Sequence, residues 1–186
     1  MSELRVNLVK DLFQSSISEH SDAQANFTGL DTKAQNTTAI GGIFLAGALA
    51  FFNGDSLQKL ITIGSHPAII LLGIVVLLLM LSTAFCIWAM RIQDISISDV
   101  AISKEEVEAI IEQPSDELSE RYENYLLSQV GEWSRISKGL REVNQRKAKA
   151  VRRGQMFLGI AALFAAILLF YTLYAAWNLP PAVKSS

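Results

Sequence analysis

The chain has 186 residues, of which 51% are hydrophobic and 18% are charged, with a formal net charge of −2 at pH 7. The apolar share exceeds that of a typical soluble domain and favours a membrane protein, while the charge balance excludes the basic footprint of a nucleic-acid-binding domain. A single cysteine, Cys86, excludes a disulfide or a cysteine-based zinc cluster within this sequence.

The first segment, residues 1–36, is polar, mixed in charge and free of proline. Apolar residues recur in it at helical spacing: Leu4, Leu8, Leu12, Phe13, Phe27, Leu30 and Ala34. This spacing predicts amphipathic helices over 2–17 and 21–36 that pack on another cytosolic helix. The serines at 15, 16 and 18 weaken the helical pattern between them. We expect residues 1–36 to form a cytosolic helical region.

Two apolar runs follow and predict a transmembrane hairpin over residues 37–90. Residues 37–52 are rich in Gly and Ala but shorter than the roughly 20 residues that cross a bilayer, so we expect this span inside a helix bundle. Residues 67–90 carry no charge, which strongly predicts a second span.

The segment 91–154 is the one long polar stretch of the chain, and we expect a helical cytosolic region there. Ser103 and Glu106 form a capping box that predicts a short helix ending before Pro114, after which Ser115 begins another. An apolar stripe then recurs at helical spacing and needs a partner: Leu118, Tyr122, Tyr125, Leu126, Gln129, Trp133, Ile136, Leu140 and Val143.

The final apolar run, 155–178, predicts a third span with aromatic residues near its far end, and 179–186 a short tail. No proline interrupts 116–177, so we expect one long helix that runs from the cytosol into this span. Gly154, at the junction, is where we expect bending. The predicted fold class is therefore an all-α membrane protein with three transmembrane helices and a helical cytosolic region.

Basic residues crowd the segment just before the third span: Lys138, Arg141, Arg146, Lys147, Lys149, Arg152 and Arg153. The positive-inside rule then places the N-terminus and 91–154 in the cytosol and the C-terminus outside. These cations are open to two interpretations. They face anionic lipid headgroups, or some of Lys138, Arg141, Arg146 and Lys147 hold a phosphate.

In the second interpretation, Tyr122, Tyr125 and Trp133 supply a stacking face for a base; the alternative for these aromatic residues is plain core packing. Three catalytic signatures are absent from the sequence, namely the P-loop, Gly-x-Ser-x-Gly and His-Glu-x-x-His, so we expect no enzyme, and no metal or cofactor.

Asp31-Thr32-Lys33-Ala34 stands directly before the short first span, and the cytosolic helix that carries Tyr125 and Lys138 leads into the last one. In this motif and architecture, over roughly residues 20–178, the chain resembles the membrane effectors of bacterial Pycsar antiphage defence. The resemblance implies an inner-membrane protein that responds to cyclic UMP or cyclic CMP from a partner nucleotidyl cyclase. The response impairs the membrane and causes abortive infection.

The resemblance also implies a function for Asp31 and Lys33, as an ion pair or as ligand contacts. With Tyr122, Tyr125, Lys138 and Arg141 they are the candidate ligand-binding residues. The expected partners are the lipid bilayer, further copies of the chain in a homo-oligomer, and the cyclic nucleotide. Two alternatives stay open. One is a membrane scaffold that docks a cytosolic partner through the 116–150 helix; the other is a membrane-bound enzyme, against which the lack of clustered catalytic residues argues.

Overall fold

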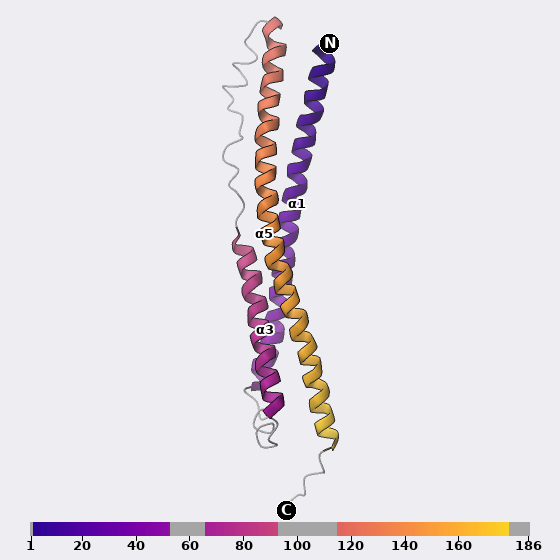
Figure 1. The fold of residues 1–186 in the computed structure, drawn as a ribbon, viewed down its shortest axis with the longest axis vertical. Helices are drawn as coiled ribbons and strands as arrows, with labels where there is room; N and C mark the ends of the chain where they lie inside the picture. The colour runs from indigo at the N-terminus through magenta and orange to yellow at the C-terminus, as the bar shows by residue number, and fades with distance from the viewer. Residues whose placement is uncertain (1, 53–65, 93–114, 179–186) are drawn as a thin grey trace, which may run out of the picture. The chain divides into compact units, whose positions relative to one another are not determined.

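A computed structural model describes residues 2–52, 66–92 and 115–178, and these contain three helices and no strand (Figure 1). Helix α1 spans Ser2–Phe52, α3 spans His66–Arg91 and α5 spans Ser115–Asn178. The all-α prediction is confirmed for this part of the chain, and α5 begins at the serine that the sequence indicated. The predicted capped helix after Ser103 lies outside the described residues.

Helix α1 is a single helix of 51 residues, where the sequence predicted two helices and a separate short span. Three of its Ser and Thr hydroxyls, those of Ser16, Thr28 and Thr37, bond to carbonyls of their own helix. Ser16 Oγ donates to the Phe13 carbonyl at 2.8 Å, and Thr37 Oγ1 donates to the Lys33 carbonyl at 2.8 Å. With these donors satisfied along the helix and no proline present, nothing terminates it at the serines.

The contacts divide the described residues into two compact units. The helix-pair unit contains α1 up to Leu30 and α5 up to Lys147. The three-helix unit contains α1 from Asp31, all of α3, and α5 from Ala148. Both α1 and α5 therefore contribute to each unit.

In the helix-pair unit α1 and α5 run parallel. Lys10 of α1 lies over Tyr122 of α5, His20 lies against Trp133, and Phe27 lies against Lys147, so residue numbers rise together along both helices. The buried positions are separated by three, four, seven or eleven residues, all of which are sums of alternating steps of three and four: Val9, Ser16, His20 and Ala23 in α1, and Leu126, Ser137, Leu140 and Lys147 in α5. A repeat of 3.5 residues is the pattern of a left-handed coiled coil.

The face of α1 that packs is not the one predicted from its large apolar residues. Leu8, Leu12 and Ile17 are exposed, whereas Val9, Ser16 and His20 are buried. We call the buried positions of α1 and α5 listed above the seam. In α5 the seam includes Leu126 and Leu140 as expected, but its other buried members are polar. The stripe predicted for α1 is therefore displaced in phase, whereas two members of the stripe predicted for α5 are buried at the contact.

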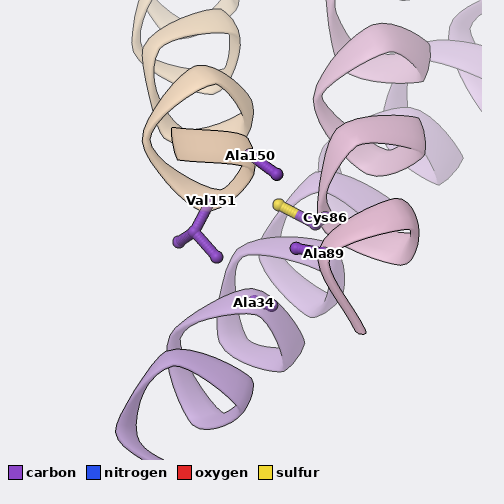
Figure 2. Packing of buried hydrophobic residues seen from close by; sticks show 5 residues of the cluster. All are labelled: Ala34, Cys86, Ala89, Ala150 and Val151. Carbon is purple, nitrogen blue, oxygen red and sulfur yellow. The ribbon is translucent and has the colours of Figure 1, made fainter. Parts of the chain in front are cut away.

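The three-helix unit packs small residues at the same 3.5-residue spacing. In α3 the buried residues are Ala68, Leu72, Val75, Leu79, Ser82, Cys86 and Ala89. Figure 2 shows one cluster, in which Cys86 and Ala89 of α3 meet Ala34 of α1 and Ala150 and Val151 of α5. Side chains this small let the three backbones approach closely, which is how helices associate where the hydrophobic drive is absent.

Helices α3 and α5 approach each other closely at Gly154. Ser82 Oγ donates to the Gly154 carbonyl at 2.8 Å, and a Cβ at Gly154 would lie 2.5 Å from Cys86 Sγ. Helix α5 continues through this glycine without interruption. Bending at Gly154 stays a prediction, and the structure shows a close helix contact there.

Two of the helices are long and apolar enough to cross a membrane, namely α3 and the Glu120–Tyr174 part of α5. Large apolar side chains are exposed on them, including Ile70, Leu77, Leu163 and Phe170. Exposed apolar surface on this scale is typical of a membrane or protein contact. The first predicted span, 37–52, is part of α1, which is not among these two helices.

Candidate functional site

The interface of the helix-pair unit is unusually polar for a coiled-coil pair. Four of its buried residues carry polar or charged side chains: Ser16, His20, Ser137 and Lys147. Polar groups at such positions weaken the pair relative to Leu or Ile and are used to specify register and partner. The buried polar side chains of this unit are thus concentrated in the seam.

His20 and Trp133 form the central ring contact of this seam. Their ring centroids lie 4.9 Å apart with the planes tilted by 59°, and His20 is only 7% exposed. Neither His20 Nδ1 nor Ser137 Oγ has a hydrogen-bond partner among the described residues. Buried polar atoms are nearly always paired in folded proteins, so these two are exceptions within this interface.

An ion pair lies beside this ring contact. Arg141 Nη2 is 3.2 Å from Glu19 Oε2, and both side chains are about half exposed. Glu19 directly precedes His20, and Arg141 lies two turns beyond Trp133. Eight residues at 100° each place Arg141 about 80° around α5 from Trp133, so the two side chains lie on neighbouring parts of one helix face.

Two further contacts complete the seam towards the end of the unit. Asn144 Nδ2 donates to the Ala23 carbonyl at 2.7 Å, which ties the two helices together through a backbone acceptor. Lys147 is fully buried, with its ammonium nitrogen 3.4 Å from the centroid of the Phe27 ring. A desolvated ammonium over an aromatic face is a favourable cation–π contact.

The cations that the sequence grouped together have different environments. Lys138 and Arg146 are exposed, Arg141 pairs with Glu19, and Lys147 is buried against Phe27. Of the aromatic candidates, Tyr122 is 37% exposed beneath Lys10, whereas Tyr125 and Trp133 are half-buried. Core packing therefore accounts for part of the aromatic stripe, and only some of the cations remain on the surface.

The structure does not bring all six predicted ligand residues together. Tyr122 and Arg141 lie 19 positions apart on one uninterrupted helix, which at about 1.5 Å per residue is about 28 Å. A mononucleotide does not reach across this distance, so the two tyrosines cannot stack its base while Arg141 holds its phosphate in the same chain. Half-buried Asp31 and exposed Lys33 belong to the three-helix unit.

Sequence reasoning missed the importance of His20, Ser137 and Asn144. It searched for large apolar residues at helical spacing, and these three are polar. The available signal was the heptad phase shared by the small and polar positions of α1 and α5, which continues into α3. Within the described residues, no group of three or more His, Cys, Asp or Glu side chains forms a metal site.

Comparison with known proteins adds no relative to this description. No family model, no curated protein and no solved structure matches the chain.

Proposed function

We propose that the chain is a membrane effector that binds a cyclic pyrimidine mononucleotide, cyclic UMP or cyclic CMP, and responds by impairing the inner membrane, leading to abortive infection. The observation that carries the proposal is the sharing of α1 and α5 between the two units. A ligand that changes the pairing of these helices acts on the same two helices that pack with α3. The nucleotide class comes from the resemblance of the sequence to the Pycsar effectors.

The proposed ligand contact is the part of the helix-pair unit around Trp133 and Arg141. The base stacks on the half-buried indole, and the phosphate takes the guanidinium of Arg141 from Glu19. Arginine suits this exchange, because its fork of donors matches a phosphate as well as a carboxylate. Lys138, exposed one turn before Arg141, adds a second cation.

Binding at this place would favour one arrangement of the seam over another. A ligand shifts such an equilibrium only by the difference between its affinities for the two states. A change from 1:99 to 99:1 takes about 5.5 kcal/mol of differential affinity. The polar seam makes such a shift attainable because its closed form is less stable than an apolar coiled coil would be. Assembly of several copies, also proposed, multiplies the number of sites.

Calorimetry of the full-length protein in detergent tests the proposal, with cyclic UMP, cyclic CMP and cyclic AMP as ligands. We expect heat of binding with cyclic UMP or cyclic CMP and a loss of at least tenfold in affinity, about 1.4 kcal/mol, in Arg141→Gln. Arg135→Gln is the matched control, because Arg135 forms a similar exposed ion pair with Glu132 on the same helix. Absence of heat with all three nucleotides would overturn the proposal.

A second candidate is a membrane scaffold that docks a cytosolic protein through α5. Its supporting observation is the exposure of Leu127 and Tyr122 on this helix, at 41% and 37%. A scaffold would show no nucleotide binding in the same calorimetry, and Leu127→Glu would release its partner.

A further inference from the structure

We propose that the three-helix unit binds a single hydrocarbon chain of a lipid in a groove between α1, α3 and α5. The groove has a volume of about 310 Å³ and opens to the surface. Its floor consists of buried residues, among them Leu72, Val75, Leu79 and Ala161, and its rim includes the exposed Phe44 and Leu169. The proposal concerns this unit alone and does not depend on nucleotide binding.

The groove exists because small residues occupy its walls. Gly47 and Ala48 of α1 line it, together with Ala161, Ala162 and Ala165 of α5. A Cβ added at Gly47 would meet no atom within 4 Å, so the facing helices leave real space at this position. By contrast, a Cβ at Gly41, one and a half turns earlier in α1, would already lie 3.2 Å from Thr83 Oγ1.

The chemistry of the lining favours hydrocarbon over water. Thr172 is the one polar side chain of the groove, and its hydroxyl donates to the Leu169 carbonyl at 2.9 Å. A buried water needs two to four hydrogen-bond partners, and an apolar cavity without them stays dry and accepts apolar guests. The groove therefore offers dispersion contacts on its floor and walls but no satisfied place for water.

The surroundings and dimensions identify a lipid chain as the occupant. The groove is lined by α3 and α5, the two helices that are apolar and long enough to span a membrane, and its rim residue Ile43 is 74% exposed. In a bilayer this opening faces acyl chains. A helix of a second copy is about 10–12 Å across with its side chains, too wide to enter a groove of this volume, whereas one unbranched chain fits.

Photolabelling of the full-length protein in phospholipid vesicles tests the proposal. The probe is a phosphatidylcholine with a diazirine near the end of one acyl chain, and labelled positions are mapped by mass spectrometry after digestion. We expect several-fold more label on the groove residues of 161–172 than on Ile70 and Leu77, which are exposed on α3 outside the groove. Gly47→Leu fills the groove and should reduce this ratio to about one.

Gly42→Leu is the matched control, because Gly42 lies on the same helix outside the groove and its Cβ would also meet nothing within 4 Å. This variant should keep the preference for the groove. Helicity and thermal unfolding of both variants are measured first, so that a misfolded variant is replaced by Ala48→Leu. Equal labelling inside and outside the groove in the unsubstituted protein would overturn the proposal. So would a preference that Gly47→Leu leaves intact.

Discussion

The ammonium nitrogen of Lys147 lies 3.4 Å from the centre of the Phe27 ring, and the lysine is fully buried. Burying an ammonium group costs free energy unless its new surroundings compensate for the lost hydration. The aromatic face supplies part of that compensation. The contact joins α1 to α5 at the last seam position of the helix-pair unit.

A double-mutant cycle on this pair should therefore give a measurable coupling. We expect Phe27→Leu and Lys147→Met to show an interaction energy of about 1–2 kcal/mol in unfolding experiments in detergent. Lys149→Met, which removes an exposed charge two residues away, should change stability by less than about 0.5 kcal/mol. A coupling near zero would mean that the ring does not stabilise the buried ammonium.

Gly154 should not tolerate a methyl group. Gly154→Ala places a Cβ 2.5 Å from Cys86 Sγ and 3.1 Å from the Ser82 carbonyl oxygen, so the helices must separate. We expect a loss of about 1–3 kcal/mol, the usual effect of overpacking. Gly159→Ala, with nothing within 4 Å, should be neutral or stabilising by up to about 1 kcal/mol.

A second substitution separates packing from helix propensity at Gly154. Cys86→Ala removes the sulfur that the new methyl group meets, and in that background Gly154→Ala should cost distinctly less. The measurement is thermal unfolding of the unsubstituted protein, Cys86→Ala, Gly154→Ala and the double variant, with Gly159→Ala for comparison. Equal stability of the two single alanine variants, Gly154→Ala and Gly159→Ala, would contradict the close contact.

The polar contacts between α1 and α5 should contribute different amounts to the free energy of unfolding. Asn144→Ala removes the side-chain donor to the Ala23 carbonyl, and we expect a loss of about 0.5–1.5 kcal/mol. Glu19→Gln removes a half-exposed ion pair and should cost no more than about 1 kcal/mol. Unfolding measured at low and high salt provides the check, because the Glu19 effect should shrink with salt. The reverse order of effects would argue against the seam described here.

The number of spans is decided by the sides on which the two ends lie. The proposed three spans put the N-terminus and the C-terminus on opposite faces of the membrane, and two spans would put them on the same face. Reporter fusions that are active only in the cytosol or only outside it give the answer for each end. We expect a cytosolic N-terminus and an external C-terminus. Both ends on the same side of the membrane would exclude three spans.

Individual helices and their starts were predictable from the sequence where one physical signal dominated. The charge-free run after Pro67 predicted a helix that the structure has as α3, and the acids after Ser115 predicted the start of α5. The sequence pattern did not predict the continuity of α1, because the serines at 15, 16 and 18 weaken the helical pattern. Their effect is offset by bonding such as that of Ser16 to the Phe13 carbonyl.

The candidate site was harder to predict because polar side chains are buried in the seam, while large apolar side chains of α1 are exposed. Leu8 and Leu12 are exposed while Ser16 and His20 are buried, so an apolar stripe drawn through the leucines marks the wrong face of α1. Tyr122 and Arg141 share a helix, but helix geometry keeps them far apart. The pairing of Glu19 with Arg141 depends on the register of two helices distant in sequence, which composition does not encode.

The most direct test of the proposed effector function is dye release from phospholipid vesicles that contain the full-length protein. Cyclic UMP or cyclic CMP should release the dye, cyclic AMP should not, and Arg141→Gln should abolish the response while Arg135→Gln retains it. Vesicles that stay sealed with all of these nucleotides, although they contain folded protein, would contradict the proposed function.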